Sequence, residues 1–266
     1  KYTYRRLRLD CLVVLGGNGS QKTANLLSEE GLNVIGLPKT IDNDLWGTDT
    51  TFGFQSAIGI ATDVIDCIHT TAASHNRVFM VEVMGHKAGW LTLNAGMAGG
   101  ADIILIPEIP YSIDSVVAKI DQRANAGHGF TILAVAEGAM SKKEAAMSKK
   151  EYKQHMAELL EQYPSVSYAI ADKILKKTGR EVRVTVPGHM QRGGTPCAYD
   201  RVLSSRLGAT AALMISKGEF GNMVAIHDHV ITSVPLKEVA GKLKTIDPAS
   251  DIITEARLLG ISFGDD

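Results

Sequence analysis

The amino-acid sequence predicts an α/β protein built on doubly wound, mostly parallel sheets, and three observations lead to this class. Short hydrophobic runs of strand length recur along the chain, most of them end at glycine or proline, and helical patterns separate them. The runs are CLVVLGG (11–17), LNVIGLP (32–38), RVFMVEVMG (77–85), DIILIPE (102–108), FTILAVAEG (130–138) and NMVAIHDH (222–229).

These runs are almost continuously apolar, so each is expected to be a strand buried on both faces, as in a parallel sheet. Between the second and third runs, apolar residues recur at helical spacing. They predict a helix with one buried stripe, formed by Phe54, Ala57, Ile58, Ala61, Val64, Ile65 and Ile68. Because ligands of such folds bind at the carboxyl ends of the strands, functional residues are expected directly after the runs.

Composition excludes several classes of function. The chain has 266 residues, 45% of them hydrophobic, and its net charge of −1 offers no bulk attraction to nucleic acid or to an anionic membrane. No apolar run approaches the roughly 18 residues of a membrane-spanning helix. Three widely spaced cysteines without a CxxC pattern (Cys11, Cys67 and Cys197) predict a reduced, cytoplasmic compartment. The chain opens on KYTYRRLRLD without a methionine, which predicts an internal cut.

The segment MSKKEAAMSKKEYK (140–153) departs from the strand–helix pattern. It repeats MSKKE after seven residues and carries little apolar surface. We expect a solvated helix or a mobile insertion there and assign it no chemistry.

The first chemical motif is VVLGGNGS (13–20), in which a strand runs into glycines and a helical pattern follows. Glycines let the backbone approach a phosphate, and the N–H groups at a helix start attract anions. A purely steric turn from strand to helix explains the same glycines equally well.

The second motif, PKTIDND (38–44), crowds acidic and amide side chains behind a strand. An Asx-rich turn explains one such residue but not Asp42, Asn43 and Asp44 in succession after Lys39. Near a phosphate loop, one carboxylate holds a divalent cation and another takes a proton from an attacking hydroxyl.

The third motif is basic and spans SHNRVFMVEVMGHKAGW (74–90) and GREVRVTVPGHMQRGGTPCAYDR (179–201). Arginine forks match phosphate oxygens with two hydrogen bonds. Any one of these cations could be a surface charge. Together they predict a second phosphate site, for an acceptor that is already phosphorylated, made by Arg77, Arg183, His189 and Arg192.

The motifs GGNGS, PKTIDND, SHNR with VEVMG, AEG and GHMQRGG occur in the order and approximate spacing of the phosphofructokinase family. From about residue 9 to its C-terminus the chain resembles this family, and in particular its branch with mixed phosphoryl donors. The resemblance implies transfer of a phosphoryl group to the 1-hydroxyl of fructose 6-phosphate, giving fructose 1,6-bisphosphate, in the committed step of glycolysis.

The resemblance also implies roles for residues. Asp42 matches the catalytic base, and Lys39 lies beside the transferred phosphate. The sugar is lined by Thr40, Ile41, Asp42, Met84, Gly85, His86 and Glu137, and its 6-phosphate is bound by His189 and Arg192. Arg77 and Arg183 match arginines from a neighbouring subunit, which implies a homo-oligomer (a dimer or a tetramer) with shared sites. The nucleotide-phosphate loop is matched by Gly17, Asn18, Gly19 and Ser20, and Mg²⁺ is matched to Asn18 and Asp44.

The chain departs from the family's usual pattern at several places. Asn18 stands where family members usually have an aspartate that binds magnesium, and His86 stands where many bacterial members have arginine. The MSKKE repeat lengthens the chain between Glu137 and Arg183. The family's first glycine-rich loop and its nucleotide-base segment are absent, so the N-terminal part of the donor lobe is expected to be missing.

By resemblance the fold is two doubly wound, Rossmann-like lobes with the active site between them. Residues 1–53 and 191–242 form the phosphoryl-donor lobe, and 54–190 with 243–266 form the sugar-phosphate lobe. The expected function is an ATP-dependent 6-phosphofructokinase. The alternatives are the pyrophosphate-dependent enzyme and a non-catalytic regulatory subunit that binds sugar phosphate, and retention of Asp42 argues against the second of these.

Two residues bear on the donor. In pyrophosphate-using relatives a second aspartate opposes the nucleotide's α-phosphate, and here that position is Gly19. Lys39 is the residue those relatives use beside the transferred phosphate, although some ATP-using branches also have it. Because a glycine is needed for ATP to fit whereas the lysine suits both donors, ATP is the expected donor.

Overall fold

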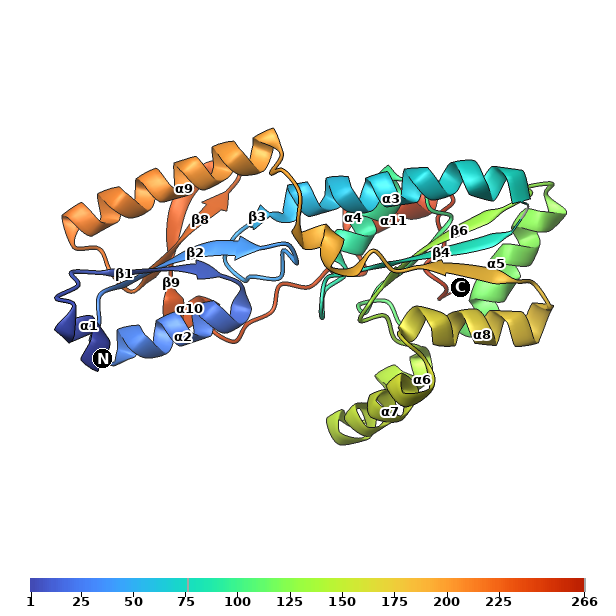
Figure 1. The fold of residues 1–266 in the computed structure, drawn as a ribbon, viewed down its shortest axis with the longest axis horizontal. Coiled ribbons are helices and arrows are strands. Elements are labelled where there is room, and N and C mark those ends of the chain that lie inside the picture. Colours follow the sequence, from blue (N-terminus) through green and yellow to red (C-terminus); the bar gives the residue numbers. More distant parts are fainter. Residues whose placement is uncertain (76, 266) are drawn as a thin grey trace. The chain divides into compact units, whose positions relative to one another are not determined.

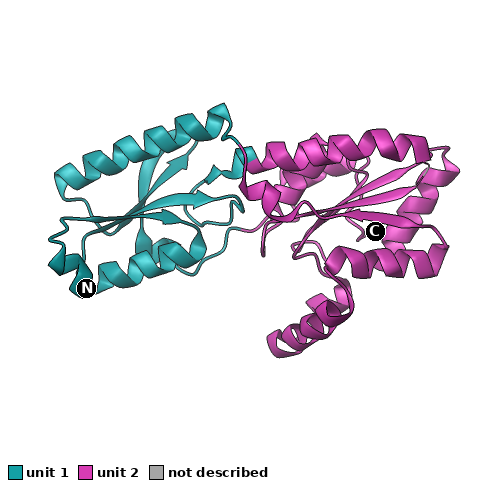
Figure 2. Cartoon of the chain, in the orientation of Figure 1, with its two compact units in different colours: residues 1–56, 195–244 teal, residues 57–194, 245–266 magenta. Residues whose placement is uncertain are grey.

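The computed structural model describes residues 1–75 and 77–265, so Asn76 of the SHNR motif lies outside the described residues. The chain forms two compact units, each with its own sheet (Figures 1 and 2). Unit 1 comprises residues 1–56 and 195–244, and unit 2 comprises 57–194 and 245–266. Each crossing between units lies a few residues downstream of the corresponding boundary expected from the sequence, at 53, 190 and 242.

The sheet of unit 1 has the strand order β1-β2-β8-β9, with β3 pairing beside β2. Neighbours are parallel except in the antiparallel pair β8–β9, a hairpin that the sequence patterns did not predict. Asp228 and His229 join this pair with φ angles of 47° and 67°, as a two-residue type I′ turn requires. The strands are β1 (Leu12–Gly16), β2 (Val34–Thr40), β3 (Phe52–Gly53), β8 (Asn222–His227) and β9 (Val230–Pro235).

Helices cover both faces of this sheet (Figure 1). One face packs on Ala24 of α2 and on Leu236 and Val239 of α10, and the other face packs on the apolar stripe of α9. A sheet buried on both sides explains the apolar runs 34–38 in β2 and 223–226 in β8. The helices of unit 1 are α1 (Tyr2–Arg6), α2 (Asn18–Glu29), α9 (Ala198–Lys217) and α10 (Leu236–Val239).

The sheet of unit 2 is entirely parallel, in the order β5-β6-β4-β7. The residues of β4 and β6 are buried throughout, because helices lie on both faces. Gly96 lets α4 approach closely, since a Cβ there would lie 2.8 Å from Ile104 Cδ1 and 3.0 Å from Ala134 Cβ. The strands are β4 (Val78–Val83), β5 (Ile103–Leu105), β6 (Thr131–Ala136) and β7 (Val182–Thr185).

The helix expected over residues 54–68 is confirmed and extends to His75 as α3. Its apolar stripe is buried at Ala57, Ala61 and Ile65. A core cluster of unit 2 joins α5 and α8 to the sheet. The helices are α3 (Phe54–His75), α4 (Trp90–Ala98), α5 (Ile113–Asn125), α6 (Lys142–Ala145), α7 (Lys149–Gln162), α8 (Val166–Thr178), the 3₁₀ helix η1 (Gly188–Arg192) and α11 (Asp251–Leu258).

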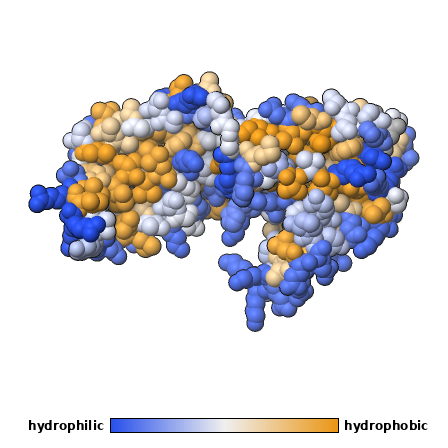
Figure 3. All heavy atoms as spheres, viewed as in Figure 1, coloured by the Kyte–Doolittle hydropathy of each residue, from blue (hydrophilic) through white to orange (hydrophobic). Residues whose placement is uncertain are grey.

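Each copy of the MSKKE repeat contains the N-terminal cap of a helix. Ser141 and Ser148 are the N-caps of α6 and α7, and each forms a complete capping box with the glutamate three residues later, Glu144 or Glu151. The segment is therefore helical, which confirms the first of the two expectations for it. Figure 3 shows these helices covered mainly by hydrophilic residues.

Unit 1 shows a broad hydrophobic area in the view of Figure 3. The exposed large apolar side chains of this unit include Leu15 on β1, which is 56% exposed and lies on an edge strand. Over the described residues, none of the helices combines the length and the apolar character needed to cross a membrane.

Candidate active site

The two motifs of unit 1 lie at the same edge of its sheet. Strands β1 and β2 are parallel, with Gly16 opposite Pro38, so the loops after them emerge side by side. A Cβ placed on Gly17 would lie 3.3 Å from Thr40 Cβ, which shows how closely the glycine loop approaches the acidic loop. The structure thus brings Gly17–Ser20 and Thr40–Asp44 together.

The glycine loop leads directly into α2. Gly17 is the N-cap residue, and no described side chain caps this helix start, so the first N–H groups keep their capacity for an anion. At Gly19 a Cβ would have no atom within 4 Å, and the position faces open space. Both features suit a loop that cradles phosphates.

Gln21 supports the glycine loop, and nothing in the sequence predicted this role. It is fully buried, and its Nε2 donates to the carbonyl oxygens of Gly16 and Leu37, at 3.0 and 2.9 Å. The side chain therefore fastens the end of β1 to the end of β2. Within a helical pattern a buried glutamine looks like any polar surface residue, so only packing reveals its role.

The acidic loop contains a local network around Asp42. Thr40 Oγ1 donates to Asp42 Oδ2 at 3.3 Å and accepts a hydrogen bond from the Asp42 backbone N–H at 3.2 Å. Asp42 is half-buried, whereas Ile41, Asn43 and Asp44 are buried. Lys39 is exposed at the end of β2.

Asn43 turns the chain in this loop. Its φ angle is 53°, in the left-handed region that asparagine tolerates better than most residues. Its Oδ1 accepts the Thr51 backbone N–H at 3.1 Å, and Thr51 Oγ1 donates to the Thr40 carbonyl at 2.8 Å. The loop is therefore closed on itself between β2 and β3.

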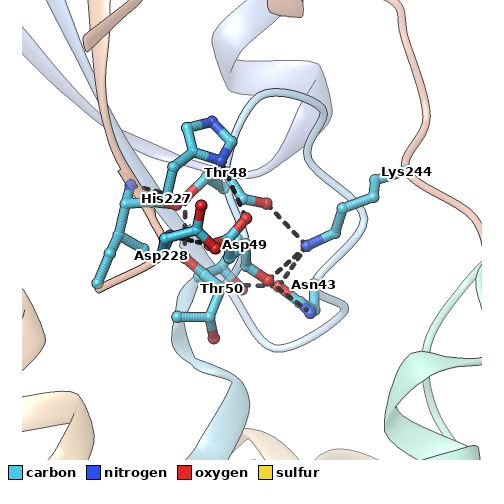
Figure 4. A network of polar contacts seen from close by, with 9 residues as sticks. Asn43, Thr48, Asp49, Thr50, His227, Asp228 and Lys244 are labelled. Atoms are coloured by element: carbon cyan, nitrogen blue, oxygen red, sulfur yellow. Dashed lines mark hydrogen bonds and ion pairs between the residues drawn. The ribbon is translucent and has the colours of Figure 1, made fainter. Parts of the chain in front are cut away.

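Lys244 enters this loop from the far end of the chain (Figure 4). Its Nζ donates to Asn43 Oδ1, to the Thr48 carbonyl and to the Asp49 carbonyl, at 3.1, 2.9 and 2.8 Å. Burial lowers the pKa of this ammonium group to about 8, although nearby Asp49 and Asp44 act in the opposite direction.

The far side of the loop is anchored to the β8–β9 turn. The carboxylate of Asp49 contacts His227 Nδ1 at 2.9 Å and accepts the Asp228 backbone N–H at 2.8 Å (Figure 4). Thr48 Oγ1 accepts the Ile226 backbone N–H at 3.1 Å. Asp49 thus has a structural contact at each of its carboxylate oxygens.

The predicted metal ligands are Asn18 and Asp44. Asn18 Nδ2 donates to the Lys242 carbonyl at 2.9 Å, a bond that an ionised aspartate cannot make. Among the described residues no group of three or more histidine, cysteine, aspartate or glutamate side chains could hold a metal ion. This donor set, one carboxylate and one amide oxygen, fits Mg²⁺ that is held mainly by phosphates and water rather than by a protein cage.

In unit 2 the residues after β4 and β6 meet at one edge. Glu137 Oε1 accepts the backbone N–H groups of Gly85 and His86, at 3.2 and 2.7 Å. Gly85 and His86 have φ angles of 147° and 53°, so the chain turns sharply after Met84. The carboxylate of Glu137 holds this turn, and a Cβ on Gly138 would collide with the His86 carbonyl.

Gln191 connects this edge to η1, which carries His189 and Arg192. Its Oε1 accepts the Met84 backbone N–H at 3.1 Å, and its Nε2 donates to the Gly188 carbonyl at 3.2 Å. Gln191 is 1% exposed. The GHMQRGG motif contains this residue, but the sequence assigned it no role.

The structure does not bring Arg77 and Arg183 to this edge. Arg77 precedes β4 whereas Met84 follows it, so the six residues of the strand, about 20 Å, separate them. Arg183 lies within β7 opposite Phe79 of β4. Both arginines pair with Glu181, Arg77 at 3.4 Å and Arg183 at 2.7 Å.

The chain is similar to proteins of one known family. The family model described as Phosphofructokinase matches residues 1–215. The chain belongs to the phosphofructokinase family. An ATP-dependent 6-phosphofructokinase of Spirochaeta thermophila is 56% identical over 262 residues, which cover 98% of this chain and 71% of that relative. The ATP-dependent 6-phosphofructokinase 3 of Bacteroides thetaiotaomicron is 48% identical over 98% of this chain and 72% of its own length.

Solved phosphofructokinase structures share the fold. The pyrophosphate-dependent enzyme of Marinobacter aquaeolei matches with a TM-score of 0.77 and 25% identity, over 94% of this chain and 65% of that one. The phosphofructokinase of Saccharomyces cerevisiae matches with a TM-score of 0.73 and 32% identity, over 89% of this chain and 33% of that one. The chain thus spans about two thirds or less of these solved proteins. The predicted α/β class and the family resemblance are confirmed.

Proposed function

We infer that this phosphofructokinase-family protein is an ATP-dependent 6-phosphofructokinase. It moves the terminal phosphoryl group of ATP to the 1-hydroxyl of fructose 6-phosphate and gives fructose 1,6-bisphosphate. The observation that carries the inference is the high identity, 44–56% over nearly the whole chain, to relatives named ATP-dependent 6-phosphofructokinase.

In this proposal residues of unit 1 bind the phosphoryl donor and accept the proton of the attacking hydroxyl. The N–H groups at the start of α2 bind the donor's phosphates, and Asp42 takes the proton of the 1-hydroxyl as it attacks. Lys39 places its ammonium group near the transferred phosphate, where negative charge accumulates. Thr40 Oγ1 donates to the Asp42 carboxylate and accepts the Asp42 backbone N–H, and this restraint on Asp42 supports the assignment.

Residues of unit 2 bind the sugar phosphate. Met84, Gly85, His86 and Glu137 line the sugar, and His189 and Arg192 bind the 6-phosphate. The contacts of Glu137 and Gln191 support this set, because they tie the β4 turn, the β6 end and η1 into one framework.

The space around Gly19 supports ATP as the donor. A nucleotide carries an α-phosphate beyond the two phosphates that pyrophosphate shares with it, and the open position at Gly19 leaves room for that group. Mg²⁺, when bound, neutralises the donor's phosphates, and Asn18 and Asp44 are the residues that would hold it.

We also assign the protein to a homo-oligomer with shared sites. Arg77 and Arg183 lie about a strand's length from the residues assigned to the sugar in their own chain, which supports their assignment to the site of another subunit. A cytoplasmic location is part of the same proposal, supported by three cysteines that are free thiols.

The test is a steady-state assay of the purified full-length protein with fructose 6-phosphate and either Mg-ATP or pyrophosphate with Mg²⁺. We expect turnover with ATP and a kcat/KM for ATP at least ten-fold above that for pyrophosphate. The pyrophosphate-dependent reaction is the second candidate, because two of the similar solved structures are named for that donor. A preference for pyrophosphate would replace the first proposal with the second, and no turnover with either donor would contradict both.

A further inference from the structure

The loop from Ile41 to Thr51 lies between β2 and β3 and has little regular structure of its own. Asn43 holds a left-handed conformation within it, and Thr48 is buried, so the carbonyl groups here need partners inside the protein. This loop carries Asp42 and Asp44. Because the loop has little strand pairing, side-chain hydrogen bonds supply part of the contacts that maintain its conformation.

Lys244 supplies such hydrogen bonds with its ammonium group. An ammonium group has three N–H bonds, and three acceptors lie within 3.1 Å of Nζ: Asn43 Oδ1 and the carbonyls of Thr48 and Asp49 (Figure 4). Asn43 lies in the first half of the loop, and Thr48 and Asp49 lie in the second half. One side chain therefore connects the two halves. Without the ammonium group, two carbonyls and the amide oxygen would lose a charge-assisted hydrogen bond in a partly buried site.

The backbone around Lys244 strengthens the same connection. The Lys244 N–H donates to the Asp44 carbonyl at 2.8 Å, and Leu243 pairs with Leu45 in an antiparallel bridge. Two residues earlier, the Lys242 carbonyl accepts the side-chain amide of Asn18. The segment 242–244 therefore touches both the acidic loop and the glycine loop of unit 1.

We propose that Lys244 is a positioning residue for the catalytic loop, whose ammonium group fixes the turn at Asn43 and thereby the orientation of Asp42 and Asp44. The inference rests on the proposed function, because Asp42 is a catalytic base only in that reaction. It adds a residue that belongs to none of the motifs and lies about 200 positions from its partners in the sequence.

The experiment compares Lys244→Met, which keeps the length of the side chain but has no donor, with Lys237→Met. Lys237 is the matched control because it is an exposed lysine of the same unit, on α10. We expect Lys244→Met to lower kcat about 10- to 100-fold with the KM for fructose 6-phosphate within about three-fold. Lys237→Met should keep kcat within about three-fold, as is usual for a surface substitution.

A double variant separates positioning from general stability. If Lys244 acts through Asp42, adding Lys244→Met to Asp42→Asn should cost little more than Asp42→Asn alone, because residues that act as a unit are not additive. Losses that multiply in the double variant would overturn the proposal. A kcat of Lys244→Met close to that of the wild type would overturn it as well.

Hydrogen exchange provides a readout that needs no activity. In Lys244→Met, amides of residues 41–51 should exchange about ten-fold faster or more, whereas those of β4 in unit 2 should keep their rates. Equal acceleration in both places, or none in the loop, would contradict a positioning role. A wild type without phosphofructokinase activity would refute the proposed function, and the exchange rates would still decide whether Lys244 holds the loop.

Discussion

Thr40 and Asp42 form a reciprocal pair at the end of β2. The threonine hydroxyl donates to the Asp42 carboxylate at 3.3 Å and accepts the Asp42 backbone N–H at 3.2 Å. One oxygen of the carboxylate is therefore occupied by a hydrogen bond, and the orientation of the whole carboxylate group is fixed. Such restraint is what a base needs to accept a proton from a bound hydroxyl.

Replacing Asp42 with asparagine should remove the base and leave the loop intact, since the amide is nearly isosteric. We expect kcat to fall by about 10²–10⁴ and the affinity for fructose 6-phosphate to change by only a few-fold. Steady-state kinetics with a direct binding measurement check this. Asp228→Asn is the control, because its φ of 47° suits asparagine, and it should retain wild-type turnover. Wild-type turnover in Asp42→Asn would show that the base lies elsewhere.

Arg77→Ala and Arg183→Ala should each raise the KM for fructose 6-phosphate about 10- to 100-fold, because a hydrogen bond to a charged group contributes about 1.5–3 kcal/mol. The KM for the donor should change less. Arg180→Ala is the matched control, since Arg180 is an exposed neighbour that pairs with Asp121. Sedimentation coupled to activity measurements tests the shared site, and an active monomer would exclude it.

Gly19→Asp should depress ATP use without disturbing the fold, because a Cβ at this position would have no atom within 4 Å. A carboxylate about 4 Å from a phosphate charge costs up to about 4 kcal/mol at an effective dielectric constant of about 20, so kcat/KM for ATP should fall at least ten-fold. Gly19→Ala adds bulk without charge and should stay within a few-fold. The ratio of kcat/KM for ATP and pyrophosphate, measured for both variants, decides between charge and size.

Glu144 should make stability depend on acid pH. Burial alone would raise the pKa of Glu144, but hydrogen bonds from the Ser141 N–H and hydroxyl and from His155 outweigh it and lower that pKa. A lowered pKa in the folded state gives stability that is present above about pH 4.5 and lost as pH falls through the folded-state value.

Glu144→Gln should therefore be less stable than the wild type at pH 7, by about 1 kcal/mol, the typical value of a cap. The difference should shrink as pH falls below about 4.5, the ordinary pKa of glutamate. Urea unfolding at several pH values measures it. Glu151→Gln is the control in the second copy of the repeat, where the glutamate is exposed and the difference should be smaller throughout. A constant difference across pH would show that the carboxylate charge has no part in it.

The sequence alone determined the α/β class, the main strands and the positions of the motifs. A strand buried on both faces must be apolar along its length, so β2, β4 and β6 are visible as runs, and the residues after them are the ones at the sheet edge. Strand β9 was missed because it is half-exposed at the edge of its sheet and has no such run.

Tertiary structure alone decided which polar side chains support the motifs. Gln21, Gln191 and Lys244 resemble surface residues in the sequence, yet each bonds to backbone or amide groups at the carboxyl ends of strands or in the loops after them. Gln191 and Lys244 find partners 107 and 196 positions away. A motif can be recognised in the sequence because its residues are consecutive and lie in one loop. The need to satisfy a buried carbonyl or N–H arises only when distant segments pack over it, so its partner is chosen by the fold.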